Sequence, residues 1–255
     1  FHLTKYLFLS IFKKYYRAIF FDFFITEICI KNSKELKTNI NTIFLNAAAH
    51  IQHHYLLSSE FYKKKYKDYN FIRKDDPILE CYKAYDVIIG NYLNKKDYNF
   101  FFATGLSQVP IEKPIYYWNF KNHETFFMKT GIQFSKIEKR MSRDYTLYFD
   151  NDEKLMKSFE LLSGIKLNSK KIFYLEKKQN KIYLELIYDL NVVAEEKLYD
   201  MYGKMISKNF LKDLNFIAVK NSIHFQKGYV FTDLDINLKK TNIKDFYNYF
   251  IQNYG

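Results

Sequence analysis

The pattern of apolar and polar positions predicts helices at both ends of the chain and in its first third. From Lys5 to Ile30 the apolar residues recur at helical spacing, which predicts one or two helices that end near Asn32. Asp76 followed by Pro77 is typical of a helix start, and the apolar periodicity then continues to Leu93. Two further stretches have a helical pattern: 152–163, capped by Asp150 or Asn151, and 241–254, started by Thr241 or Asn242.

Other stretches have the pattern of strands. Asn39–Leu45 and Tyr98–Ala103 are short, continuous apolar runs, which are typical of strands buried on both faces of a parallel sheet. Residues 171–176 and 181–188 alternate and are joined at Gln179-Asn180, which predicts a β-hairpin. Shorter strands are predicted over 145–149 and 216–219.

The order of these elements favours an α/β fold. It predicts a mostly parallel central sheet flanked by helices, with the β-hairpin as an insertion. No internal repeat or low-complexity linker marks a second domain, so we expect residues 1–255 to form a single domain.

The composition narrows the classes of function. The net charge is +12, but the basic residues are 36 Lys and only 4 Arg, spread along the whole chain. Arg is the residue that makes bidentate contacts to phosphates and bases, so specific nucleic-acid binding is not expected. The Lys-rich run 62–69 is interpreted as a solvated face or loop. No uncharged run approaches the roughly 20 residues of a membrane span, and the two distant cysteines predict a reducing, cytoplasmic compartment.

Half of the six histidines lie in one short segment, AAAHIQHHY (47–55). If this segment is helical, Asn46, His50 and His54 lie four residues apart on one face, whereas His53 lies about a hundred degrees away. Imidazole is a common ligand of zinc and manganese-like ions, so the spacing indicates a candidate metal site. The alternative, histidines that bond to backbone carbonyls, is equally compatible with the spacing.

Four motifs in order, FLNAAAHIQHHY, YDVIIG, FFFATGLSQ and NSIHFQKGYVF, resemble the type I phosphodiesterase and nucleotide pyrophosphatase branch of the alkaline phosphatase superfamily. The resemblance covers about Ile43 to Phe231. It implies an alkaline phosphatase-like fold in which His50 and His224 bind one metal ion, zinc or manganese. Asn46 stands where the family has a carboxylate ligand, and His54 is a neighbouring candidate ligand.

The chain also departs from this family. Thr104-Gly105-Leu106-Ser107-Gln108 stands where the family has the Asp-His ligands of a second metal, and no strand before residue 39 supplies the family's Thr or Ser nucleophile. Either the chain is the C-terminal part of a longer alkaline phosphatase-like domain, or the site is reduced. The two-metal clamp of the family therefore cannot be assembled from the residues of this chain.

Further polar residues are candidates for the same functional site. Thr104 is a candidate catalytic residue and Gln108 a candidate substrate contact, although both also suit an ordinary turn. His123 is a candidate ligand or general acid, and a structural loop histidine is the alternative. Arg140 and Arg143 are candidates to hold a phosphate or carboxylate, and an Arg–Asp pair that fixes a loop is the alternative.

Three hypotheses follow from the sequence. The first is a metal-dependent phosphoester hydrolase or transferase that acts on a phosphorylated small molecule or nucleotide. The second is a non-catalytic module that binds a phosphate or a sugar nucleotide on the same fold. The third is a basic protein whose Lys-rich face binds an anionic membrane or nucleic acid.

Overall fold

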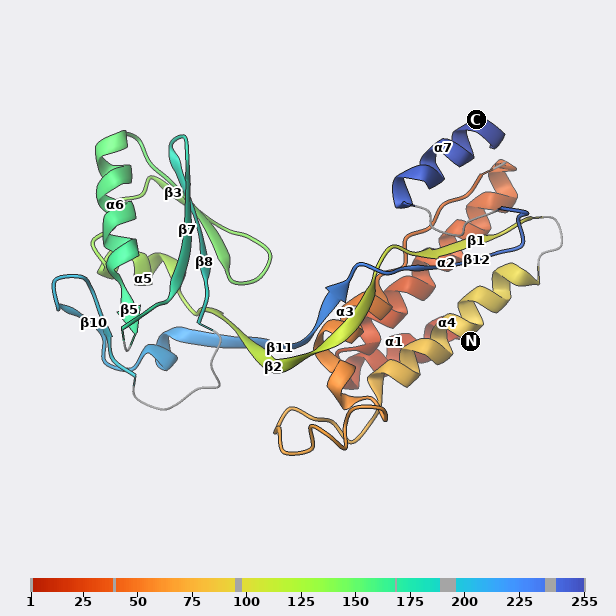
Figure 1. The fold of residues 1–255 in the computed structure, drawn as a ribbon, viewed down its shortest axis with the longest axis horizontal. Coiled ribbons are helices and arrows are strands. Elements are labelled where there is room, and N and C mark those ends of the chain that lie inside the picture. The colour runs from red at the N-terminus through yellow and green to blue at the C-terminus, as the bar shows by residue number, and fades with distance from the viewer. Residues whose placement is uncertain are drawn as a thin grey trace. The chain divides into compact units, whose positions relative to one another are not determined.

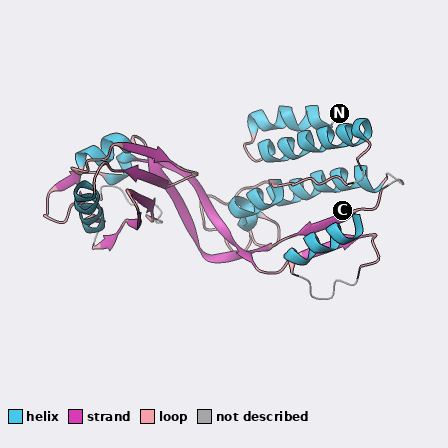
Figure 2. Cartoon of the chain, turned by 90° about the horizontal axis from the view of Figure 1, so that it is seen from above, coloured by secondary structure: helices cyan, strands magenta, loops and turns pink. Residues whose placement is uncertain are grey.

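The computed structural model describes residues 2–38, 40–94, 98–167, 169–188, 196–236 and 242–254. The chain divides into two compact units (Figures 1 and 2). We call Phe1–Lys113 with Asn221–Gly255 the helical unit, and Pro114–Lys220 the sheet unit.

The helical unit is built from helices and one two-stranded ribbon. Asp76 caps α4 through its side chain, which accepts a hydrogen bond from the Leu79 N–H at 2.9 Å, so the predicted helix start is confirmed. The ribbon pairs β1 with β12 antiparallel, from Phe101 opposite Thr232 to Thr104 opposite Tyr229. The elements are α1 (His2–Phe12), α2 (Tyr16–Leu36), α3 (Ala47–Tyr55), the 3-10 turn η1 (Leu56–Ser58), α4 (Pro77–Leu93), β1 (Phe101–Thr104), β12 (Tyr229–Thr232) and α7 (Ile243–Tyr254).

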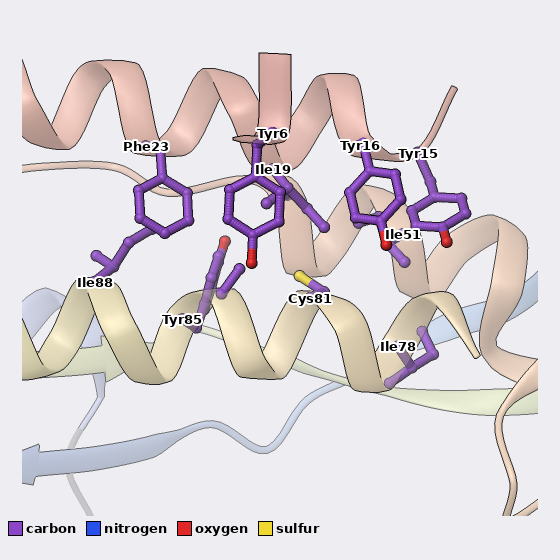
Figure 3. Packing of buried hydrophobic residues seen from close by; sticks show 12 residues of the cluster. Tyr6, Tyr15, Tyr16, Ile19, Phe23, Ile51, Ile78, Cys81, Tyr85 and Ile88 are labelled. Atoms are coloured by element: carbon purple, nitrogen blue, oxygen red, sulfur yellow. The ribbon is translucent and has the colours of Figure 1, made fainter. Parts of the chain in front are cut away.

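The core of the helical unit forms where α1, α2, α3 and α4 bury one face each. Figure 3 shows side chains of α2 and α4 that point toward one another. The helical spacing of the apolar residues places them on these buried faces. The fully buried side chains include Ile19, Phe23, Ile51 and Ile88.

The sheet unit contains two four-stranded sheets, ordered β3-β4-β8-β7 and β10-β9-β5-β6. The predicted hairpin is confirmed, because β7 and β8 pair antiparallel around Gln179 and Asn180. Asn151 caps α6 by accepting from the Lys154 N–H. Its elements are α5 (His123–Lys129), β3 (Lys136–Lys139), β4 (Asp144–Tyr148), α6 (Asp152–Gly164), β5 (Lys166–Leu167), β6 (Lys170–Lys171), β7 (Phe173–Lys178), β8 (Lys181–Leu186), β9 (Leu198–Tyr199), β10 (Met205–Ser207) and the 3-10 turn η2 (Phe210–Asp213).

Two long strands belong to both units. β2 (Ser107–Phe120) and β11 (Leu214–Phe225) are hydrogen-bonded neighbours. The predicted strand 216–219 therefore lies inside a longer strand, β11.

The prediction of a mostly parallel central sheet flanked by helices is wrong. The sheets have two or four strands each, and the pairings defined among the described residues of β1, β3–β10 and β12 are antiparallel. The apolar run that ends at Ala103 forms part of β1, whose partner comes from near the end of the chain. Its apolar character reflects packing on α7, where Phe101 lies 4.9 Å from Phe246 and 5.1 Å from Phe250 between ring centres.

The first predicted strand is also wrong where the structure describes it. Residues 40–46 have no regular secondary structure and lead into α3. Phe44 is 80% exposed, so this apolar run is not buried on both sides. Asn39 and Thr241, each at the start of a predicted element, lie outside the described residues.

Candidate functional site

The N-terminus of α3 is held by a buried carboxylate from α2. Asp22 is 2% exposed and accepts hydrogen bonds from the Asn46 N–H at 3.2 Å and the Ala47 N–H at 2.8 Å. The Asn46 side chain makes no capping hydrogen bond, so Asp22 takes the role that an N-cap side chain usually has. A negative charge at this end also interacts favourably with the helix dipole.

Tyr85 of α4 completes this anchor. Its hydroxyl donates to Asp22 Oδ2 at 2.7 Å and accepts from the Ala48 N–H at 3.1 Å. Burial raises the pKa of Tyr85, and the hydrogen bond to Asp22 raises it further, so the hydroxyl remains a donor at all ordinary pH values. Three successive amides, from Asn46 to Ala48 at the start of α3, are thus bonded to two side chains from other helices.

The C-terminal part of α3 is held by the strand that carries the last motif. Asn221 and Ser222 of β11 are both 0% exposed. The Asn221 side chain donates to the His54 carbonyl at 2.8 Å and accepts from the Leu56 N–H at 3.1 Å. The Ser222 hydroxyl lies 2.9 Å from the Gln52 carbonyl oxygen. These contacts join segments about 170 residues apart.

Gln108 of β2 forms hydrogen bonds with both α3 and β11. Its amide nitrogen donates to the Ala49 carbonyl at 2.9 Å, and its amide oxygen accepts a hydrogen bond from the Ser222 hydroxyl. The structure therefore places this candidate beside α3, as one of the groups that hold it. Contact between Gln108 and a substrate remains a prediction.

Four of the six histidines form a continuous group, the histidine cluster (His50, His53, His54 and His224). His50 and His54, one turn apart on α3, have ring centres 5.2 Å apart at 70°. His53 and His54 have ring centres 6.4 Å apart. The ring of His224 lies 4.7 Å from that of His53. The rings of His50 and His224 are exposed enough to meet a ligand from solvent.

The contact of His53 with His224 follows from the side of α3 on which His53 lies. The spacing of the sequence places His53 on a different side of α3 from His50 and His54, and it is His53 that faces β11. The exposed side chain of Asn46 lies at the start of the same helix. The metal-ligand role predicted for Asn46, His50, His54 and His224 stays a prediction.

A metal ion requires several ligand side chains that converge on one point. Among the residues that the structure describes, no group of three or more His, Cys, Asp or Glu side chains is placed to hold a metal ion. Zinc sites in proteins use three or four such ligands. A complete zinc or manganese site is therefore not preformed among the described side chains, and metal binding by the cluster stays a prediction.

Thr104 has a role in the β1–β12 ribbon. Its hydroxyl oxygen accepts from the Tyr229 N–H at 2.9 Å. A Cβ atom at Gly228 would come within 1.9 Å of the Thr104 carbonyl oxygen, so only glycine fits beside this turn. The contacts of Thr104 are those of a turn residue, and its catalytic role stays a prediction.

The remaining candidates lie in the sheet unit. Arg143 donates to Glu185 at 2.7 and 2.8 Å and stacks over the Tyr117 ring at 4.3 Å. Arg140 lies 3.4 Å from a carboxylate oxygen of Glu138. Both arginines thus pair with a glutamate, Arg140 within β3 and its turn and Arg143 with β8, instead of forming the Arg–Asp pair of the alternative.

His123 begins α5, and its ring lies 5.3 Å from that of Tyr145. Burial lowers the pKa of His123, which favours the neutral imidazole. The predicted role of His123 as a ligand or general acid stays untested, as does substrate binding by Arg140 and Arg143.

Sequence reasoning missed the side chains that position α3. Asp22 lies inside the predicted helical stretch 5–30 and is not among the candidate site residues. A single acid among Phe20, Phe21, Phe23 and Phe24 is itself a signal of a buried, bonded carboxylate. Asn221 and Ser222 gave a similar signal, because two polar residues precede His224 inside a strand.

Comparison with protein-family models, curated proteins and solved structures gives no match.

Proposed function

We propose that the histidine cluster binds the phosphate group of a phosphorylated small molecule or nucleotide, in a divergent phosphoester hydrolase or transferase. The observation that supports this is the 4.7 Å contact between His224 and His53, which joins the first and last histidine motifs. The same two motifs carry the resemblance to phosphodiesterases.

The surroundings of the cluster suit such a role. A helix bonded at both ends holds its side chains in fixed positions, which lowers the cost of ordering them around a ligand. Imidazoles donate hydrogen bonds to phosphate oxygens, and near neutral pH they can also give or take a proton at the leaving or attacking oxygen. No step of this chemistry is assigned to a metal, because the described histidines do not form a metal site.

A non-catalytic binding module is the second candidate. It is favoured by a second observation, which is that no group of three metal ligands is found among the described residues. Such a module would bind a phosphate or sugar nucleotide through the histidine cluster without turnover.

The test measures turnover and binding on the same preparations of the full chain. Hydrolysis of bis-p-nitrophenyl phosphate is followed with added zinc, with added manganese and with a chelator, and nucleotide binding is followed by calorimetry. We expect His224→Ala and His54→Ala to reduce both turnover and binding at least about tenfold. The control is His2→Ala, since His2 lies outside the cluster and its ring stacks on Phe23.

Each outcome decides between the candidates. Binding that depends on the cluster, without turnover under any metal condition, supports the binding module and excludes the hydrolase. Turnover and binding that are unchanged in both cluster variants would exclude the proposal altogether.

We also propose a compartment for the protein, from the state of its two cysteines. Cys29 and Cys81 are free, which supports a reducing compartment such as the cytoplasm. Burial raises the pKa of Cys81 to about 12, so its thiol stays protonated and unreactive. None of the described helices has both the length and the apolar character of a bilayer-spanning segment.

A further inference from the structure

The segment between η1 and α4 forms a hollow lined almost entirely by cations. It is wide and open to solvent, with a volume of about 620 Å³. We call it the basic hollow. It lies within the helical unit, and its lining residues are Lys63, Lys64, Lys67, Ile72, Arg73 and Lys74.

Three of these cations carry charge that the described part of the chain does not pair. Lys64, Lys67 and Lys74 are exposed, and no ion pair among the described residues involves them. Lys63 is paired with Glu60. No acidic residue lines the hollow, so the field inside it is positive and attracts anions.

Arg73 is held in place at the edge of the hollow. Its guanidinium donates to Asp75 at 2.7 Å and lies 5.7 Å from the Tyr15 ring centre and 6.0 Å from that of Tyr55. Lys13 binds the same carboxylate at 2.8 Å. A guanidinium fixed by a carboxylate and two rings loses little freedom when it binds an anion.

We propose that the basic hollow is a binding site for a small anion that carries two or more linked phosphates. Several cations around one hollow match a compact, highly charged ligand better than a single phosphate. No residue of the histidine cluster lines the hollow, and the proposal does not depend on the function proposed for that cluster.

The aromatic residues around the hollow favour a small ligand over a nucleic acid. Single-stranded nucleic acids bind on exposed aromatic faces. In this segment Tyr66 is buried, and the Tyr69 ring packs between Tyr66 at 6.2 Å and Phe71 at 5.2 Å. Phe61 is 93% exposed, but it is not among the residues that line the hollow.

The experiment titrates the full chain by calorimetry with inorganic phosphate, pyrophosphate and tripolyphosphate, at roughly 50 mM and 200 mM salt. We expect the affinity to rise from phosphate to tripolyphosphate and to fall as salt is raised. The triple variant Lys64→Ala, Lys67→Ala and Lys74→Ala should bind tripolyphosphate at least about tenfold more weakly. All three side chains are exposed, so the fold should persist, and circular dichroism checks this.

Matched controls separate the hollow from net charge and from the histidine cluster. Lys129→Ala, Lys157→Ala and Lys178→Ala together remove the same charge from exposed positions of the sheet unit. This variant should bind tripolyphosphate like the wild type, and so should His224→Ala.

Three results would overturn the proposal. One is equal tripolyphosphate binding by the wild type and the hollow variant. Another is an equal loss in the control lysine variant, which would show attraction to net charge alone. The third is binding of an oligonucleotide, or of anionic phospholipid vesicles, that needs these lysines but that tripolyphosphate does not displace.

Discussion

Two buried regions of this protein are built on opposite principles. The anchors of α3 in the helical unit are polar, with Asp22, Tyr85, Asn221 and Ser222 bonded to the backbone of one short helix. The sheet unit instead contains an aromatic cluster of packed rings, formed by Phe120, Phe126, Phe127, Tyr145, Phe173 and Phe210.

The two kinds of contact have different roles: aromatic packing contributes mainly to stability, and buried hydrogen bonds fix the position of an element. Ring packing is favourable over a range of arrangements, and its free energy grows with the apolar area removed from water. Buried hydrogen bonds contribute less net free energy but are satisfied in one geometry only. The polar anchors therefore specify where the histidine helix lies, whereas the aromatic cluster stabilises its unit.

The largest expected effect is on the aromatic cluster. Phe127 is 0% exposed and its ring lies 5.4 Å from Phe120 and 5.8 Å from Tyr145. Phe127→Ala removes these contacts and leaves a cavity, so we expect a loss of about 4 kcal/mol in the free energy of unfolding. Urea unfolding measures it, with Met128→Ala, 64% exposed, as the control. A loss below that of the control would show that the ring contributes no packing.

The next effect is on the N-terminal anchor of α3. Asp22→Ala leaves two amides and the Tyr85 hydroxyl without their acceptor, so we expect a loss of about 3 kcal/mol. Hydrogen exchange at the Asn46 and Ala47 amides should accelerate together with the loss seen in urea unfolding. The control is Glu27→Ala, an exposed acid on the same helix. Unchanged protection of these amides would contradict the anchoring role of Asp22.

The smallest effect depends on pH. Burial acts to raise the pKa of Asp75, but hydrogen bonds from Arg73 and Lys13 outweigh it and hold the pKa well below its ordinary 3.8. A carboxyl with a lowered folded-state pKa stabilises the fold above its unfolded pKa, and this contribution is lost as pH falls through the folded pKa.

Asp75→Asn should therefore cost about 1 to 2 kcal/mol at pH 7, and the difference from wild type should shrink below about pH 4. Urea unfolding between pH 7 and pH 2.5 measures it, with the exposed Asp68→Asn as the control. A difference that is constant across this range would show that the charge of Asp75 contributes nothing.

The parts of the fold that could be predicted are those with local signals. Asp76 with Pro77, and Asn151, mark the helix starts that the structure confirms. The hairpin of β7 and β8 was predicted because its strands adjoin a short turn. An apolar run in the sequence indicates that a strand is buried, but it does not indicate which strand pairs with it. The parallel sheet was predicted wrongly for this reason. The partner of β1 lies about 130 residues away, in β12.

The contacts of the candidate site could also be predicted only where they are local in the sequence. The spacing of His50 and His54 gave their contact on α3 because four residues make about one turn. The contact of His53 with His224 was not predictable, because it depends on which side of the helix meets β11. Asp22 was missed because a helical pattern does not show which carbonyls and amides lie beside a charge.

The double attachment of α3 has a consequence for how its sequence can change. Inserting or deleting one residue between Ala47 and Tyr55 would turn everything after it by about 100°. The amides near Asp22 and the carbonyl bonded by Asn221 could then no longer both keep their partners. Point changes on its outer side should therefore be tolerated in evolution, while its length stays constant.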